Sequence, residues 1–334
     1  MHERRRAAMR AVVCEEFGEP AAVLRLRDAE APRPGPGEVL VRAVARSINP
    51  SDLLTVRGVY ARHTRLPLVP GFEAVGTVVA VGDGVPAGMV GRRVLPLKGA
   101  GTWQEVVTAP AAWAVEVPDA VPDAVATQLY INPISVLRML TVELDLQPGD
   151  VVVANAAGSA CGRIAAQLAR ELGLRLLAVT HSDAYTDELT ALGAAAVVNG
   201  AREDVSAAVR RLTGGRGARA ALDAIGGAAG EALVELIEPG GTLVSYGLLS
   251  GALLPVDLPA ARARGVAVRS FWLRPWTERC TPTEWHAAFG AIIERVVAGT
   301  LALPAGGAYD LAEVADAVRA AEASGRSGKI VLTG

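Results

Sequence analysis

The most diagnostic segment of the chain reads Val151-Val-Val-Ala-Asn-Ala-Ala-Gly-Ser-Ala-Cys-Gly-Arg-Ile-Ala-Ala-Gln-Leu-Ala-Arg170. Its first four residues are apolar, as in a buried parallel strand, and small residues follow over 156–162. From Ile164 to Ala169, apolar residues recur at helical spacing. A strand, a turn of small residues and a helix in immediate succession place unpaired backbone amides where a pyrophosphate can approach.

This turn matches the G-x-G-x-x-G pattern only in part, since its three positions hold Ala157, Ser159 and Gly162. A tight turn that needs small residues for packing alone is the alternative. The following sequence favours dinucleotide binding, because apolar runs alternate with helical segments and so predict a parallel, doubly wound sheet of the α/β class. These runs cover 174–179, 194–199, 219–225, 242–246 and 266–273.

The sequence before this region has a different character. Short β-type runs at 10–14, 38–45, 74–81 and 103–108 are separated by proline and glycine turns, which indicates a compact, barrel-like β domain. Near the other end, amphipathic helices are expected at 283–297 and 312–323, and a closing strand at 328–332. We therefore predict a dinucleotide-binding domain over 124–273 and a β-rich domain made of 1–123 with 274–334.

Composition and charge exclude several classes of protein. The 334 residues carry a formal charge of −2, which provides no basic field for nucleic acid or an acidic membrane surface. The three cysteines are scattered without a C-x-x-C pair, which suits a reducing cytosol and provides no thiolate zinc site. No segment has the pattern of a membrane span, and the basic start over 1–9 lacks the apolar core of a secretory signal, so we expect a cytoplasmic protein.

Four further segments carry a resemblance that covers nearly the whole chain. They are Asn49-Pro-Ser-Asp-Leu53 with Gly58-Val-Tyr60, Gly101-Thr-Trp-Gln104, Ile131-Asn-Pro-Ile-Ser-Val-Leu-Arg-Met-Leu140, and Phe271-Trp-Leu273 followed by Trp276. With this domain order, the chain resembles the medium-chain dehydrogenase/reductase superfamily. It is most similar to the mitochondrial-type trans-2-enoyl thioester reductases of the zinc-free branch, close to the quinone oxidoreductases. The resemblance implies a GroES-like β-rich catalytic domain joined to a Rossmann domain.

A catalytic zinc ion needs three Cys, His or carboxylate ligands and an open position. Asn49 stands where the zinc alcohol dehydrogenases carry a cysteine, and Phe72 precedes Glu73 where they carry a histidine. We therefore expect no metal, and a structural hydrogen bond for Glu73.

The resemblance implies NADPH-dependent reduction of the C2=C3 bond of a trans-2-enoyl thioester carried on coenzyme A or acyl carrier protein. Hydride adds to C3 and a proton to C2, for which the resemblance designates Tyr60 as donor. The alternative for Tyr60 is an ordinary loop tyrosine over a cleft, and Tyr130 is a weaker rival. Arg57, Arg62, His63 and Arg65 bracket Tyr60 and suit either a solvated loop or an anionic carrier.

The resemblance also assigns cofactor-binding residues. Asn132 is expected at the nicotinamide end, and the pyrophosphate is expected along Gly158, Ser159, Ala160 and Cys161. The nicotinamide pocket would be lined by Tyr246, Gly247, Leu248, Phe271, Trp272 and Leu273, with Lys329 near its edge. Core packing of an edge strand is the alternative for Phe271 and Trp272.

The residues after the second strand bear on the choice between NADPH and NADH. Thr180, His181 and Ser182 include no acid of the kind that binds ribose hydroxyls, which favours NADPH. They include no arginine either, and Asp183 lies about where the dinucleotide pattern expects an acid. NADPH is favoured and NADH is the alternative.

Two rival functions share this sequence pattern: an NADPH quinone or enone oxidoreductase, and a redox-silent family member that binds NADPH. We also predict a homodimer, because 266–273 is a late strand at the expected sheet edge, and such edges are normally covered or paired.

Overall fold

The computed structural model describes residues 8–99 and 101–334, so the basic start of the chain lies almost entirely outside the described residues. The chain divides into two compact units. One contains Met1–Ile131, Cys280–Ala298 and Leu303–Gly334, and the other contains Asn132–Arg279 and Gly299–Ala302. The divisions thus lie several residues beyond positions 123 and 273, and the short return at Gly299–Ala302 has no counterpart in the sequence analysis.

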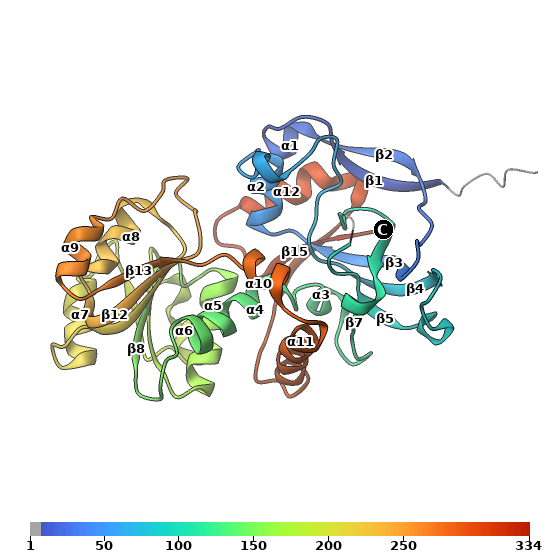
Figure 1. Ribbon diagram of the computed structural model, residues 1–334. Helices are drawn as coiled ribbons and strands as arrows, with labels where there is room; N and C mark the ends of the chain where they lie inside the picture. The colour runs from blue at the N-terminus through green and yellow to red at the C-terminus, as the bar shows by residue number, and fades with distance from the viewer. Residues whose placement is uncertain (1–7, 100) are drawn as a thin grey trace, which may run out of the picture. The chain divides into compact units, whose positions relative to one another are not determined.

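The second unit is built on a six-stranded sheet with the order β10-β9-β8-β11-β12-β13 (Figure 1). Every neighbouring pair is parallel. The strands are β8 (Val151–Ala154), β9 (Arg175–Thr180), β10 (Ala196–Asn199), β11 (Ala218–Asp223), β12 (Ile237–Ser245) and β13 (Ala267–Ser270). The chain begins in the middle, runs to one edge and then builds the other side, which is the Rossmann order. The predicted doubly wound sheet is confirmed.

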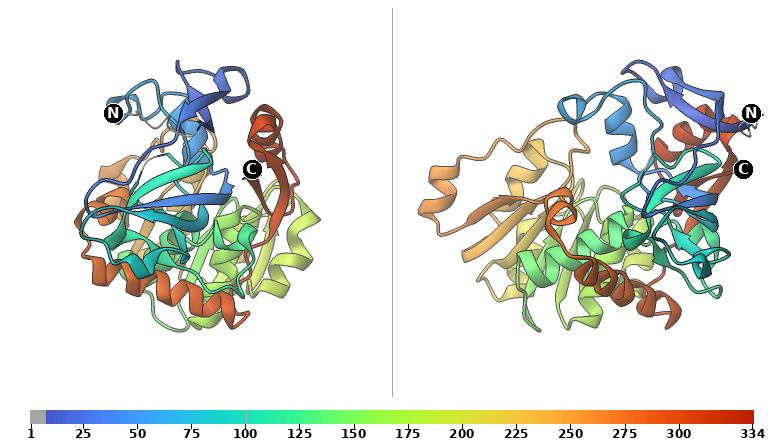
Figure 2. Two further views of the ribbon diagram at one scale, coloured as in Figure 1. Left: turned by 90° about the vertical axis from the view of Figure 1, so that its right-hand side faces the viewer. Right: turned by 45° about the vertical axis from the view of Figure 1, so that its right-hand side comes forward.

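Helices cover both faces of this sheet. Figures 1 and 2 show α5 and α6 on one side and α7, α8 and α9 on the other. Their bounds are α5 (Ala160–Glu171), α6 (Thr186–Leu192), α7 (Val205–Thr213), α8 (Gly227–Val234) and α9 (Leu258–Ala263). The central strands are nearly continuous apolar runs, and Val153, Leu177 and Leu243 have no exposed surface, as a sheet covered on both faces requires. Beside this sheet lie α4 (Ile131–Arg138), the π-helical turn Met139–Glu143 that continues it, and α10 (Arg274–Arg279).

The first unit is rich in short strands, in agreement with the predicted β domain. A seven-stranded sheet has the order β14-β15-β3-β4-β5-β7, with β6 paired to β3, and β1 and β2 form a separate antiparallel pair. The strands are β1 (Ala8–Cys14), β2 (Leu24–Glu30), β3 (Glu38–Ser47), β4 (Val75–Val81), β5 (Arg93–Leu95), β6 (Val106–Pro110), β7 (Val115–Glu116), β14 (Ala305–Asp310) and β15 (Lys329–Thr333). Its helices are α1 (Pro20–Val23), α2 (Pro50–Val56), α3 (Asp123–Ala126), α11 (Pro282–Val297) and α12 (Val314–Glu322). The α12 helix covers β15, so the end of the chain completes the core of this unit.

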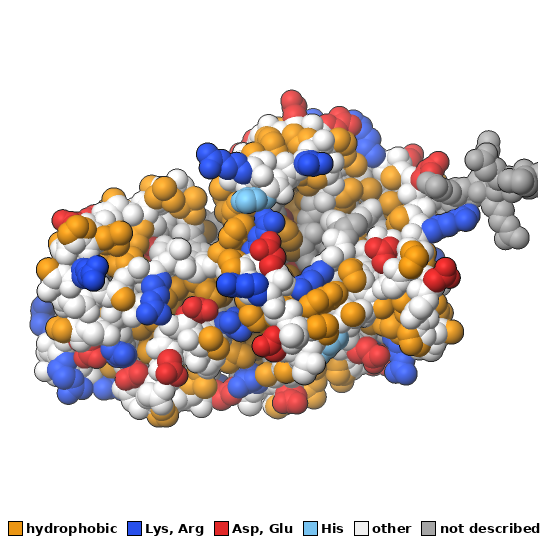
Figure 3. All heavy atoms as spheres, viewed as in Figure 1, with side chains coloured by type: hydrophobic (Ala, Val, Ile, Leu, Met, Phe, Trp, Pro, Cys, Tyr) orange, Lys and Arg blue, Asp and Glu red, His pale blue; other side chains and the backbone are white. Residues whose placement is uncertain are grey.

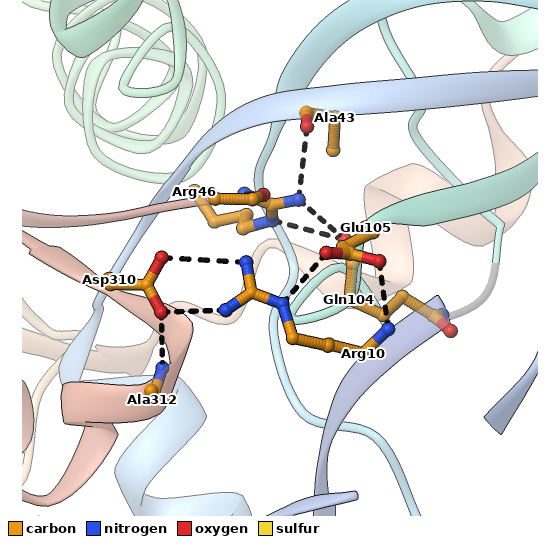
Figure 4. A network of polar contacts seen from close by, with 8 residues as sticks. Arg10, Ala43, Arg46, Gln104, Glu105, Asp310 and Ala312 are labelled. Carbon is orange, nitrogen blue, oxygen red and sulfur yellow. Dashed lines mark hydrogen bonds and ion pairs between the residues drawn. The ribbon is translucent and has the colours of Figure 1, made fainter. Parts of the chain in front are cut away.

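Two arginines tie the distant strands of this unit together (Figure 4). Arg46 on β3 is fully buried, and its Nη2 donates to the carbonyl oxygens of Gln104 and Ala43, at 2.6 and 3.0 Å. Burial lowers the pKa of Arg46 to about 10, which still leaves the guanidinium charged at neutral pH. Arg10 on β1 pairs with Glu105 at 2.8 Å and with Asp310 on β14 at 2.9 Å. These bonds join β1, β3 and β14, and therefore segments 300 positions apart.

The surface carries mixed charge. On the face seen in Figure 3, basic and acidic side chains are interspersed, in keeping with the formal charge of −2. Over the described ranges, no helix combines the length and apolar character needed to cross a bilayer.

Candidate functional site

The turn between β8 and α5 has the geometry of a phosphate cradle. Ser159 is the N-cap of α5, and its hydroxyl oxygen accepts from the amide of Gly162 at 3.2 Å. Ala156 has a φ of 47°, and a side chain on Gly162 would collide with the backbone of Ala157, so the turn folds tightly onto the helix. Gly158, Ser159, Ala160 and Cys161, the residues predicted to bind the pyrophosphate, form the end of this turn and the start of the twelve-residue helix α5, whose first amides have no partners within the helix.

Three predicted cofactor residues meet beside this helix start. The thiol of Cys161 lies 3.5 Å from Oδ1 of Asn132, near the start of α4. Tyr246, directly after β12, forms a side-chain hydrogen bond with Cys161. Burial, together with the nearby Cys161 and Asp223, raises the pKa of Tyr246 well above its ordinary value, so its hydroxyl stays protonated. Residues from three separate segments thus form one cluster at the carboxyl ends of the strands.

Asn155 and Asp223 hold these strand ends together and were not predicted from the sequence. Asp223 is completely buried at the end of β11, and it accepts from Asn155 at 2.7 Å and from the hydroxyl of Ser245 at 2.8 Å. It also accepts from the amides of Ile225 and Gly226, so the carboxylate is well satisfied. Its backbone oxygen accepts from the amide of Tyr246 at 2.9 Å. The sequence does contain a signal for this role, because Asp223 is an acidic residue at the end of a buried apolar run.

The segment after β13 differs from its prediction. The run expected over 266–273 is a strand only at Ala267–Ser270, and Phe271 to Leu273 lie beyond its end. Leu273 is buried, Phe271 is partly buried and Trp272 is 47% exposed. Trp272 stacks with the guanidinium of Arg274 at 5.4 Å. Gly247 and Leu248 follow Tyr246 and are both partly exposed.

The polar residues after β9 form a closed turn. Thr180 is buried, and its hydroxyl donates to the carbonyl oxygen of Ser182 at 2.9 Å. The hydroxyl of Ser182 accepts from the amide of Ala184 at 3.2 Å. His181 is exposed, with its ring 6.3 Å from that of Tyr185.

Tyr60 belongs to the first unit and lies in the loop between α2 and the 3-10 turn Ala61–His63. Its side chain is half-buried, and burial raises its pKa, so the phenol is protonated at neutral pH. The loop is anchored by Arg57, which pairs with Glu19 at 2.7 Å and Glu322 at 2.8 Å. Of the cations around Tyr60, Arg57 is thus used within the fold, whereas Arg62, His63 and Arg65 are exposed.

A buried polar chain lies in the same unit. The ammonium group of Lys329 donates to Oδ1 of Asn49 at 2.6 Å, and Nδ2 of Asn49 donates to Glu73 at 2.6 Å. The other oxygen of Glu73 accepts from the amides of Tyr130 and Ile131, at 3.2 and 2.7 Å. Lys329 is therefore buried in this chain of hydrogen bonds, and Glu73 holds the backbone directly before Asn132.

These residues do not fit a zinc ion. Both oxygens of Glu73 already accept hydrogen bonds, and a lysine ammonium lies on the far side of Asn49. In the part of the chain that the structure describes, no group of three His, Cys, Asp or Glu side chains is placed to hold a metal ion.

The fold and the phosphate turn together define a two-unit, dinucleotide-binding α/β protein. Family models match both units: "Alcohol dehydrogenase GroES-like domain" over residues 35–119 and "Zinc-binding dehydrogenase" over 160–291. The rat mitochondrial enoyl-[acyl-carrier-protein] reductase is 31% identical over 97% of this chain and 88% of its own length. The chain belongs to the medium-chain dehydrogenase/reductase superfamily, a superfamily of oxidoreductases.

Solved structures agree with this assignment. A putative NADPH:quinone reductase from Bacillus thuringiensis superimposes with a TM-score of 0.95 at 38% identity, covering 98% of this chain and 99% of that one. A mycobacterial protein complexed with NADPH superimposes with a TM-score of 0.89 at 32% identity, covering 98% and 100%.

Proposed function

We propose that this chain reduces the C2=C3 bond of a trans-2-enoyl thioester with NADPH. The observation that best supports NADPH as the cofactor is the turn at the start of α5, where Asn132 and Tyr246 both contact Cys161. A relative of similar structure is described as an NADPH complex, which supports the same cofactor. An enoyl thioester as the substrate is supported by relatives of similar sequence, among them the enoyl-[acyl-carrier-protein] reductases of rat and Arabidopsis.

NADPH, when bound, supplies a hydride for C3 of the substrate. The chain's own residues would then perform the remaining steps. Ala160 and Cys161 would offer the first amides of α5 to the pyrophosphate, Ser159 would cap the helix start, and Gly158 would allow a close approach. Asn132 and Tyr246, held by Cys161, would orient the nicotinamide, and Gly247, Leu248 and Phe271 to Leu273 would line its pocket. Lys329 acts indirectly, through Asn49 and Glu73, on the backbone before Asn132.

Tyr60 is the proposed proton donor. Hydride addition at C3 moves charge onto the thioester oxygen, and the enolate must be protonated at C2. A phenol whose pKa is raised by burial is fully protonated at neutral pH and can supply that proton. The exposed Arg62, His63 and Arg65 suit the phosphates of coenzyme A or the acidic surface of a carrier protein.

A second candidate is an NADPH quinone reductase. It is favoured by the Bacillus thuringiensis structure, which is 38% identical and described as a putative NADPH:quinone reductase. The two activities separate in one assay, in which NADPH absorbance is followed with crotonyl-CoA and separately with a simple quinone. Turnover of the quinone alone would contradict the enoyl proposal, and turnover of neither would indicate a redox-silent protein.

The mechanistic test is Tyr60→Phe, which removes one hydroxyl and keeps the ring. We expect kcat with crotonyl-CoA to fall about 10²–10⁴-fold, with a much smaller change in KM. The matched control is Tyr130→Phe, because Tyr130 packs against the rings of Trp285 and Phe289 at 5.4 and 5.7 Å. A Tyr60→Phe variant with the parent rate would remove Tyr60 from the mechanism.

A further inference from the structure

The turns that follow β9 and β10 are joined to each other. Thr180 and Asn199 are partners in the parallel pairing of these strands, and the amide of Gly200 donates to the carbonyl oxygen of Thr180 at 2.9 Å. Residues shortly after β10 therefore lie next to residues shortly after β9. In a Rossmann sheet, the end of this second strand is where the adenosine ribose is recognised.

The carboxylate of Asp183 is bound by the neighbouring turn. Nδ2 of Asn199 donates to its Oδ1 at 2.7 Å, and Nη1 of Arg202 donates to its Oδ2 at 2.8 Å. Asn199 is itself held, because its Oδ1 accepts from the amide of Ala201 at 3.1 Å. Both oxygens of Asp183, the acid that could bind ribose hydroxyls, thus already accept hydrogen bonds, and one donor is the cationic side chain of Arg202.

Thr180 and Arg163, two of the other polar groups near this turn, are committed elsewhere, whereas His181 is exposed. The hydroxyl of Thr180 donates to Ser182 within the turn. Arg163 pairs with Glu188 at 2.6 Å and also donates to the carbonyl oxygen of Gly158. Arg202 differs, because its side chain is 75% exposed, and a guanidinium has five N–H donors. An exposed ion pair such as Arg202–Asp183 contributes little to stability, so the guanidinium is free to bind a stronger anion at small cost.

We propose that Arg202 recognises the 2′-phosphate of NADPH, from the turn after β10 rather than from the end of β9. The inference rests on the proposed cofactor and assigns its selectivity to one residue. A planar guanidinium binds phosphate in bidentate fashion, and the phosphate carries more negative charge than the Asp183 carboxylate. Asn199 keeps its bond to Asp183 when Arg202 turns to the phosphate, and Asp183 opposes phosphate binding by repulsion.

The test measures dissociation constants of the full chain for NADPH, NADH and 2′,5′-ADP at one fixed ionic strength. Arg202→Ala should weaken NADPH and 2′,5′-ADP about tenfold and change NADH less than about twofold, because only the first two carry the 2′-phosphate. Arg202→Lys should fall between, since lysine keeps the charge and loses the fork. Asp183→Asn should tighten NADPH. The control is Arg211→Ala, the same change in charge at an exposed position of α7.

The outcomes separate this inference from the proposed function. Parent-like NADPH affinity in Arg202→Ala, or an equal loss in Arg211→Ala, overturns the role of Arg202 while leaving NADPH as the cofactor. A parent protein that binds NADH but neither NADPH nor 2′,5′-ADP overturns both.

Discussion

Adding one methyl group at Gly162 should damage both the stability of the dinucleotide unit and its cofactor affinity. An alanine Cβ there would lie 2.5 Å from the carbonyl carbon of Ala157, and it would meet the Cα and oxygen of the same residue still more closely. Real contacts of this kind need well over 3 Å, so the turn must move by about 1 Å away from α5. The new Cβ would meet backbone atoms, and these cannot move aside by a change of rotamer as a side chain can.

Overpacking of this kind costs about 1–3 kcal/mol. For a unit of this size, each kcal/mol lowers the melting temperature by about 2–4 °C, so we expect a loss of about 2–12 °C. The same movement displaces the amides at the helix start, and the dissociation constant for NADPH should rise about tenfold or more. Melting followed by circular dichroism and cofactor binding followed by fluorescence measure the two effects.

Gly158→Ala provides the control within the same turn. The three atoms nearest to a Cβ at Gly158 would belong to the ring of Tyr185, at 3.0 Å, and that side chain can rotate away. We therefore expect a much smaller change in melting temperature from Gly158→Ala than from Gly162→Ala. Equal effects of the two substitutions, or parent-like behaviour of Gly162→Ala, would refute the tight turn as the reason for this glycine.

Two further predictions concern stability and assembly. Burial raises the pKa of Asp52 to about 7, well above its unfolded value near 4, so the parent loses up to about 4 kcal/mol of stability as pH rises from 4 to 7. Asp52→Asn lacks this charge, and its free energy of unfolding relative to the parent should improve between pH 4 and 7 in urea titrations; a constant difference would contradict the raised pKa. The second prediction is a homodimer, because β13 lies at the edge of the parallel sheet. Light scattering should give the mass of two chains, and a monomeric mass at micromolar concentration would count against it.

The central strands of the parallel sheet could be predicted from the sequence because they are buried on both faces. Strands such as β8 and β9 read as largely apolar runs, and the run at 151–154 coincides with β8. The strands of the first unit were harder to predict. Charged residues interrupt the apolar residues of β2, and β5 and β7 have only three and two residues. Pairing between β14 and β15 depends on segments more than twenty residues apart, and no local pattern encodes it.

The candidate site divides in the same way. The helix start at Ser159 was predictable, since small residues between a strand and a helix are a local signal. The proposed role of Arg202 could not be predicted from the sequence, because it depends on which strand lies beside β9, and that is a property of the folded sheet. Lys329 was expected at the pocket edge, and its hydrogen bond to Asn49, 280 positions earlier, could not be read from either segment alone.

The place of β15 between β14 and β3 has a consequence for synthesis on the ribosome. The Rossmann strands occupy one uninterrupted stretch and can pair as soon as residue 270 has emerged. In the first unit, β4 and β6 can pair with β3 early, but Ala45–Ser47 of β3 and the strand β14 must wait for residues 329–333, which are made nearly 300 residues after β3. At about 5–20 residues per second, Ala45–Ser47 at the end of β3 spend at least about 15 seconds without the β15 partner. A nascent chain paused before residue 329 should therefore hold a protease-resistant Rossmann core and a protease-sensitive N-terminal segment.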